Sequence, residues 1–126
     1  GVKGPLVGFE IMLGNIPLPR SKGGNSRGPL KSSDFQSVER DFAFVVNTDV
    51  EANDIVKAVR SVNKNLIDNI SVFDVYQGDG IDDDKKSIAL NVKLQPQDKT
   101  MTDDEIDAFR IQVIDIVSNK LGGTLR

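Results

Sequence analysis

The side chains that could carry chemistry in this chain are carboxylates, lysines and a single tyrosine, Tyr76. The chain has no histidine and no cysteine, so it cannot build a Ser-His-Asp or Cys-His site, a zinc centre or an imidazole acid/base. It also lacks the G-x-x-x-x-G-K-[ST] loop and the G-x-G-x-x-G turn that cradle phosphates. These absences argue against nucleotide hydrolysis by this chain alone.

The densest group of charged residues is the acidic run from Asp79 to Asp84, followed by Lys85-Lys86. The run does not have the D-x-[DN]-x-[DN]-G-x5-E order of a calcium-binding loop, so we interpret it as a solvated hairpin tip. Lys85, Lys86 and Lys93 have two interpretations of equal weight. They either contact phosphate groups or protect strand edges from pairing with other chains.

Charge is unevenly distributed along the chain. Residues 1–39 carry five basic and three acidic groups, a formal charge of +2, whereas residues 40–126 carry 11 basic and 16 acidic groups, a formal charge of −5. An acidic domain attracts nucleic acid poorly, because non-specific affinity comes mostly from cations that neutralise phosphates. Any nucleic-acid binding must therefore depend on local contacts.

Length and composition predict one compact domain with an appended arm. A chain of 126 residues with 38% hydrophobic and 28% charged residues lies in the ordinary globular range. It contains no apolar run long enough to span a membrane and no secretory signal pattern. The absence of cysteine fits a reducing, cytoplasmic location.

The first 39 residues are expected to form the arm, as a remnant of a preceding region. Residues 6–13 (LVGFEIML) are apolar and partly alternating, which predicts a strand. Residues 14–34 are rich in glycine, proline, serine and basic residues, which is typical of a linker. We therefore expect an N-terminal strand and linker over residues 1–39 and a folded domain over residues 40–126.

The folded domain shows alternating strand and helix patterns. Two T-x-x-E sequences, at Thr48–Glu51 and Thr102–Glu105, are typical of helix starts, and Gly122-Gly123 of a helix end. The expected elements in chain order are a strand at 42–46, a helix from Thr48, strands at 70–76 and 87–94, a helix from Thr102 and a short strand at 124–126. This β-α-β-β-α-β order predicts an α+β, ferredoxin-like fold, with two helices on one face of a four-stranded antiparallel sheet.

The other sheet face should then be open, and side-chain alternation predicts what it displays. The third strand, with every second residue aliphatic, should turn Ser87, Ala89 and Asn91 outward. In the second strand we expect Phe73 and Val75 to face the helices and Asp74 and Tyr76 to face outward. The first strand should bury Phe42, Phe44 and Val46 and expose Ala43 and Val45. An aromatic ring beside small residues, a carboxylate and a hydroxyl suits one splayed-out nucleobase.

Several separated motifs resemble one known family. They are Arg40-Asp41, Phe73-Asp74-Val75-Tyr76-Gln77-Gly78, Lys85-Lys86-Ser87-Ile88-Ala89, Thr100-Met101-Thr102-Asp103-Asp104-Glu105 and the closing Leu125-Arg126. In this order they resemble the anticodon-binding ferredoxin-fold domain of the bacterial phenylalanyl-tRNA synthetase β chain. The likeness spans residues 40–126, and the lead-in before Arg40 is similar to the β-chain segment that enters that domain.

The resemblance implies a role for four residues. Tyr76 would stack on the first anticodon base, Asp74 and Ser87 would lie near its polar edges, and Ala43 would line the same position. It also implies phenylalanine tRNA, the rest of the β chain and the α chain as partners. No cofactor is expected in this fragment, since ATP and Mg would be used by the parent ligase, and neither is a catalytic residue or a metal site.

Two other functions remain open on the residues alone. A regulatory module that binds a free amino acid can use the same split β-α-β fold. A small hydrolase of the acylphosphatase type is less well supported, because no arginine-rich phosphate loop follows the first strand.

Overall fold

The computed structural model describes residues 3–17 and 33–126, which divide into two units that we describe separately, Gly1–Lys31 and Ser32–Arg126. The division falls before the boundary expected between residues 39 and 40. Ser33 accounts for part of this difference, because its hydroxyl donates to the Pro96 carbonyl at 2.6 Å. Gln95 Nε2 likewise donates to the Phe35 carbonyl at 2.7 Å. These bonds attach the lead-in to the domain before its first strand.

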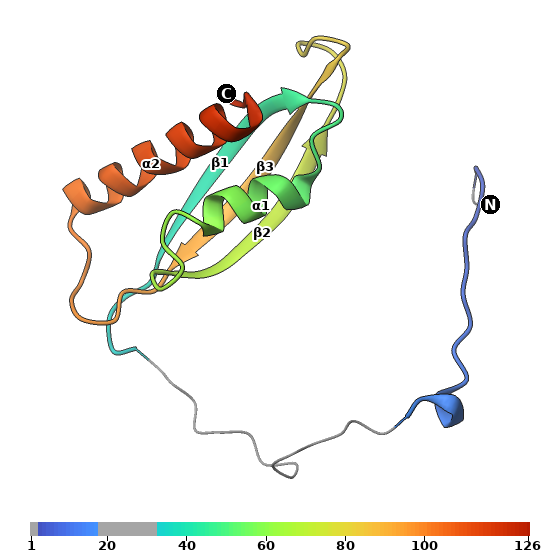
Figure 1. The fold of residues 1–126 in the computed structure, drawn as a ribbon, viewed down its shortest axis with the longest axis horizontal. Helices are drawn as coiled ribbons and strands as arrows, with labels where there is room; N and C mark the ends of the chain where they lie inside the picture. The colour runs from blue at the N-terminus through green and yellow to red at the C-terminus, as the bar shows by residue number, and fades with distance from the viewer. Residues whose placement is uncertain (1–2, 18–32) are drawn as a thin grey trace. The chain divides into compact units, whose positions relative to one another are not determined.

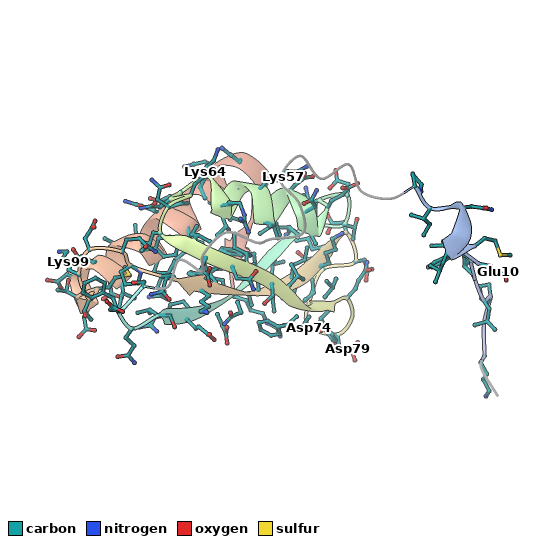
Figure 2. The ribbon with its side chains drawn as sticks, turned by 90° about the horizontal axis from the view of Figure 1, so that it is seen from below. Glu10, Lys57, Lys64, Asp74, Asp79 and Lys99 are labelled. Carbon is teal, nitrogen blue, oxygen red and sulfur yellow. The ribbon has the colours of Figure 1, made fainter. Side chains whose placement is uncertain are left out.

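The second unit is built on a four-stranded antiparallel sheet (Figure 1). The strands are β1 (Val38–Asn47), β2 (Ile67–Tyr76), β3 (Lys85–Leu94) and β4 (Thr124–Leu125), in the spatial order β2-β3-β1-β4. Two helices, α1 (Ala52–Arg60) and α2 (Asp103–Leu121), cover one face, and Figure 2 shows the layers edge-on. The predicted β-α-β-β-α-β order and ferredoxin-like α+β fold are confirmed.

The core lies between this sheet face and the helices. In β3 every second residue is fully buried, as its alternation predicts, and the same holds for the predicted inward residues of β1. The core also includes Ile55 and Val59 of α1 and Phe109, Val113 and Val117 of α2. Each buried aliphatic or aromatic side chain contributes about 1.5–3 kcal/mol relative to an exposed one, so this layer holds the helices on the sheet.

Helix α2 begins and ends where its sequence predicts. Glu105 N–H donates to Thr102 Oγ1 at 3.3 Å, and Thr102 N–H donates to Glu105 Oε2 at 3.0 Å, which completes the capping box. Gly122 ends the helix in the left-handed conformation, with φ of 62°. A Cβ on Gly123 would lie 2.7 Å from Val117 Cγ1, so glycine lets the chain return to the sheet as β4.

The helix start predicted at Thr48 is wrong. Thr48 N–H donates to the Asp84 carbonyl at 2.9 Å, and Lys86 Nζ donates to the Thr48 carbonyl at 2.7 Å. These contacts tie Thr48 to the β2–β3 connection and to β3. Helix α1 begins at Ala52 instead, with Glu51 as an N-cap that makes no side-chain capping bond.

Phe73 and Val75 were expected to face the helices, but neither side chain is buried, since their exposed fractions are 61% and 55%. Phe73 is the extra residue of a β-bulge in β2, where Val72 pairs with Leu90 and Asp74 with Ala89. Val75 pairs with the inward-facing Ile88, but β2 is an edge strand and its end projects past α1 (Figure 1). The helices therefore cover little of this end.

In the first unit the strand expected at Leu6–Leu13 is not formed. Residues 6–12 have no regular secondary structure, and Leu13–Asn15 forms one 3-10 turn. A strand needs a hydrogen-bonded neighbour, and within residues 3–17 and 33–126 no other segment pairs with this one. Most of the expected linker lies outside the described residues.

No helix in the described ranges is long and apolar enough to cross a membrane.

Candidate nucleic-acid interface

The uncovered sheet face is organised as rows of side chains that run across the strands. Directly paired residues on neighbouring strands point to the same side of a sheet. One row contains Tyr76 of β2, Ser87 of β3, Val45 of β1 and Thr124 of β4, because each pairs with the next. Tyr76, the only tyrosine of the sequence, therefore lies next to Ser87, as expected from the sequence.

The adjacent row contains Asp74 of β2, Ala89 of β3 and Ala43 of β1. It lies about 7 Å from the first row, the distance between alternate residues of a strand. Ala43 and Ala89 are half-buried and Asp74 is exposed. Along this row, two small residues therefore follow the carboxylate toward the opposite edge of the sheet. The four predicted residues Tyr76, Asp74, Ser87 and Ala43 thus lie in two neighbouring rows of one face.

The bulge at Phe73 is what places Asp74 and Tyr76 on this face. Ile70 and Val72 pair with Val92 and Leu90 and face the helices. Strict alternation from Val72 would turn Asp74 and Tyr76 toward the helices as well. The extra residue reverses the phase, and the sequence pattern alone does not locate it.

Tyr76 is held against its own hairpin. Its hydroxyl donates to the Asp79 carbonyl at 3.2 Å, and Gly78 follows with φ of 153°. A Cβ on Gly78 would lie 3.1 Å from the Tyr76 hydroxyl oxygen, so glycine allows the ring to lie close to the turn. Asp74 and Asp79 lie at the same end of the sheet, on the side away from the helices (Figure 2). Tyr76 as a whole residue remains 39% exposed, which leaves surface for stacking.

Ser87 differs from the other three because only 5% of its surface is exposed, although it lies on the open face. Its neighbours in the row, Tyr76 and Val45, flank it on both sides. A ligand would therefore reach Ser87 from above, between these two side chains. This depth was not predictable from alternation alone.

The lysines near the interface already have partners within the domain. Lys85 Nζ donates to Asp82 Oδ2 at 2.9 Å, and Lys93 Nζ lies 3.2 Å from Asp68 Oδ2. The Lys85 contact lowers the pKa of Asp82 and raises the pKa of Lys85, through the hydrogen bond first and the charge attraction second. Neither lysine is left as an unpaired cation, and both belong to β3, which lies between β1 and β2, so the proposed protection of a sheet edge is not supported.

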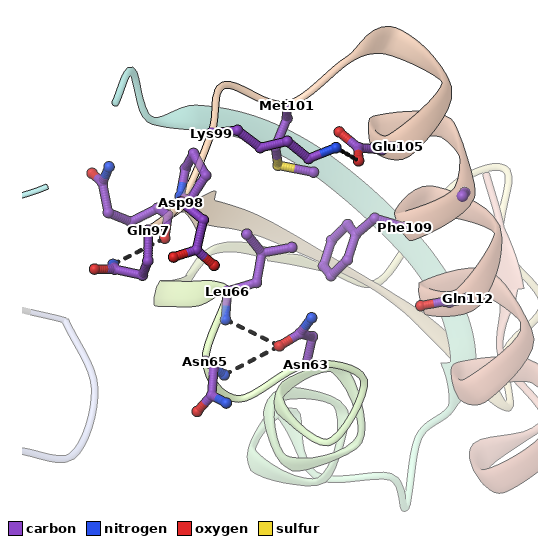
Figure 3. Close-up of a pocket in the computed structure, with 13 residues that line it drawn as sticks. Asn63, Asn65, Leu66, Gln97, Asp98, Lys99, Met101, Glu105, Phe109 and Gln112 are labelled. Carbon is purple, nitrogen blue, oxygen red and sulfur yellow. Dashed lines mark hydrogen bonds and ion pairs between the residues drawn. The ribbon is translucent and has the colours of Figure 1, made fainter. Parts of the chain in front are cut away.

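A cavity of about 420 Å³ lies at the other end of the domain (Figure 3). Leu66, Met101 and Phe109 give it apolar surface. Two of its polar side chains are engaged in local structure, since Asn63 Oδ1 accepts from the Asn65 and Leu66 N–H groups and Glu105 belongs to the capping box. Lys99 donates to Glu105, and this bond, followed by the Thr102 N–H, lowers the pKa of Glu105.

A free amino acid needs partners for both its ammonium and its carboxylate. Lys99 is the cation that lines this cavity, and it is bonded to Glu105, so it is not free for the carboxylate of a bound amino acid, and the cavity does not favour the amino-acid-binding alternative. Within the described part of the chain, no group of three or more potential ligand side chains could hold a metal ion.

Comparison with known proteins gives the chain's relationships. The profile of the ferredoxin-fold anticodon binding domain matches residues 33–126. The chain is 51% identical over 126 residues to the phenylalanine–tRNA ligase beta subunit of Rhodopseudomonas palustris. It is 48% identical over 126 residues to that of Bradyrhizobium diazoefficiens and 47% identical over 125 residues to that of Rhodospirillum rubrum. These alignments cover 99% to 100% of the chain and 16% of each relative.

The profile match includes all four strands, both helices and the two rows of the open face. It begins at residue 33, where Ser33 bonds to Pro96. The chain belongs to the family of ferredoxin-fold anticodon binding domains.

Proposed function

We propose that this chain is the RNA-recognition module of a phenylalanine–tRNA ligase β subunit and that it binds the anticodon of phenylalanine tRNA on its open sheet face. The observation that carries the proposal is the pairing that puts Tyr76 beside Ser87 and aligns Asp74 with the two alanines in the next row. The names of the relatives support the choice of tRNA.

Each residue has a distinct part in the proposed contact. The Tyr76 ring stacks on one unstacked base, which requires an exposed aromatic surface held in a fixed position. Ala43 and Ala89 leave room for the base or its sugar, because a larger side chain in their row would fill the space. Asp74 accepts hydrogen bonds from base N–H groups, and the Ser87 hydroxyl both donates and accepts.

The module has no catalytic role in this proposal. Activation of phenylalanine with ATP and Mg takes place in other parts of the ligase, and the chain spans 16% of the relatives it matches. The rest of the β chain, the α chain and the cytoplasmic location are part of the same proposal. Because the domain is acidic, its own affinity for RNA is expected to be weak, in about the micromolar range or weaker.

Binding of an anticodon stem-loop of phenylalanine tRNA tests the proposal. Tyr76→Ala should weaken binding by about 1–3 kcal/mol, the usual contribution of one base stacked on an aromatic ring. Tyr76→Phe keeps the ring and loses only the hydroxyl contact to Asp79, so it should retain most of the affinity. NMR titration suits the expected weak binding and shows in the same spectra whether each variant is folded.

Val75→Ala is the matched control, because Val75 is the neighbour of Tyr76 on the opposite side of the sheet. It should leave RNA binding unchanged. Equal affinity of folded Tyr76→Ala and the parent chain would reject the proposed interface, and so would a loss of affinity in Val75→Ala as large as that in Tyr76→Ala.

A further inference from the structure

The row that contains Asp74, Ala89 and Ala43 continues onto the end of the chain. Arg126 N–H donates to the Ala43 carbonyl at 2.9 Å. The preceding pairs are Phe44 with Leu125 and Val45 with Thr124, so the next position in the same register places Arg126 beside Ala43. Leu125 is half-buried and packs against the core. Alternation therefore directs the exposed Arg126 side chain to the open face.

Arg126 differs from the other cations of this face in its surroundings. Lys93 pairs with Asp68, and Lys85 with Asp82. Among residues 3–17 and 33–126, no carboxylate lies within ion-pair distance of the Arg126 guanidinium. The face otherwise displays acidic groups, including Asp74 at the far end of the same row and Asp41 in the next row. Arg126 is thus a local positive charge on an acidic surface.

We infer that Arg126 binds a phosphate group of the anticodon backbone. This inference rests on the proposed function, and it specifies how the bound nucleotide is oriented on the sheet. The row has a carboxylate on β2, two alanines on β3 and β1, and a guanidinium beside β4. Three strand spacings, about 14 Å, separate its ends. The base edge, which offers N–H donors, lies toward Asp74, and the sugar-phosphate backbone lies toward Arg126.

The chemistry of the two ends supports this direction over its reverse. A phosphate near Asp74 would meet a like charge, whereas the planar guanidinium matches phosphate geometry and donates two parallel hydrogen bonds. The small side chains of Ala43 and Ala89 allow the nucleotide to cross the sheet between the two ends. A phosphate contact carries no sequence information, so Arg126 should add affinity without selecting the anticodon.

Arg126→Gln and Arg110→Gln give a matched test. Both remove one guanidinium, but Arg110 is an exposed residue of α2 on the covered side of the domain. Stem-loop binding is measured by NMR titration at several salt concentrations, together with Tyr76→Ala. A second stem-loop has an abasic nucleotide at the first anticodon position.

Arg126→Gln should weaken binding about three- to tenfold and lower the salt dependence of log K by about 0.7, the value for one phosphate contact on a single strand. Arg110→Gln should change neither quantity by as much. With the abasic stem-loop, the effect of Arg126→Gln should remain while that of Tyr76→Ala disappears, because only the stacking partner is lost.

The possible failures separate this contact from the proposed function. Normal affinity and salt dependence in Arg126→Gln, with a loss of binding in Tyr76→Ala, would overturn the phosphate contact and leave the anticodon interface in place. Equal effects of Arg126→Gln and Arg110→Gln would also overturn it, since net charge would then explain both. Absence of stem-loop binding by the parent chain would reject the proposed function and the Arg126 contact together.

Discussion

Strands β3 and β2 have ten residues each and pair with one another, yet they differ in the regularity of their burial and pairing. In β3 burial alternates without interruption from Ser87's neighbour Ile88 to Leu94. In β2 the pairing shifts twice, between Ile67 and Asn69 and between Val72 and Asp74. Strand β3 is hydrogen-bonded on both sides, whereas β2 is at the edge of the sheet.

The difference shows how a sheet can reorient exposed side chains without weakening its core. An extra residue in β3 would have to be accommodated by both β1 and β2, and it would turn aliphatic side chains away from the helices. An extra residue in β2 affects one neighbour only. The bulge at Phe73 therefore reorients Asp74 and Tyr76 while the β1–β3 register stays intact. Bulges are frequent at sheet edges and next to functional sites for this reason.

Single-residue deletions give the largest expected contrast. Deletion of Ala89 reverses the inward and outward alternation of β3 on one side of the deletion. Ile88 then leaves the core, or polar residues of β3 become buried. It should cost more than about 5 kcal/mol, comparable with the whole stability of a small domain. Deletion of Phe73 removes the extra residue, leaves Asp74 opposite Ala89 and Tyr76 opposite Ser87, and should cost no more than about 1 kcal/mol.

Urea denaturation followed by circular dichroism measures both deletions. The Phe73 deletion should unfold cooperatively and keep its stem-loop affinity, while the Ala89 deletion should show no cooperative transition. Similar losses of stability in the two chains would mean that β2 tolerates register changes no better than β3.

Two identical substitutions sharpen the comparison with a smaller effect. Val92 of β3 is fully buried, whereas Val75 of β2 is 55% exposed. Val92→Ala should lower the free energy of unfolding by about 2–3 kcal/mol, through lost burial and the cavity left behind. Val75→Ala should lower it by less than about 1 kcal/mol. The same urea titrations measure both, and equal losses would show that the helices cover the end of β2.

The parts of the fold that were predictable from sequence depend either on interactions between residues close in sequence or on a strand that is paired on both sides. The alternation of β3 located the core face, and the capping box at Thr102 and Glu105 located α2, because its two hydrogen bonds join residues three apart. The same T-x-x-E pattern at Thr48 failed. There the backbone of Thr48 is hydrogen-bonded to Asp84 and Lys86, more than 30 residues away. These long-range bonds replace the local capping bonds, and a four-residue sequence pattern cannot predict them.

The candidate interface was predictable only in part, because its details depend on which residues of neighbouring strands are paired. Asp74, Tyr76, Ser87 and Ala43 were assigned to one face, and the register places them in two adjacent rows. Their assignment assumed strict alternation in β2, which missed the bulge at Phe73 and the exposure of Val75. A bulge depends on which residues of the neighbouring strand are paired. The strand predicted at Leu6–Leu13 failed similarly, because its pattern is apolar but its pairing depends on another segment.

The smallest expected effect concerns the hairpin that connects β2 to β3, where Lys85 donates to Asp82. This contact depresses the folded-state pKa of Asp82, so its contribution to stability is present above the unfolded-state pKa and is lost as pH falls through the folded-state pKa. For Lys85 the folded-state pKa is raised, so the contribution is lost as pH rises through that value. Both groups are exposed, and the effect on global stability is therefore small.

A carbon-detected NMR titration of the carboxylates measures this contact directly. The pKa of Asp82 should lie below that of an unpaired aspartate, and Lys85→Gln should raise it, because the charged ammonium donor and the charge attraction are both removed. Glu105 is the internal control, since Lys99 and the Thr102 N–H lower its pKa independently of the hairpin. An unchanged Asp82 pKa in Lys85→Gln would mean that the turn does not hold the start of β3 through this pair. The register of the two strands would then depend on the backbone bonds of the turn, among them Lys85 N–H to the Asp82 carbonyl.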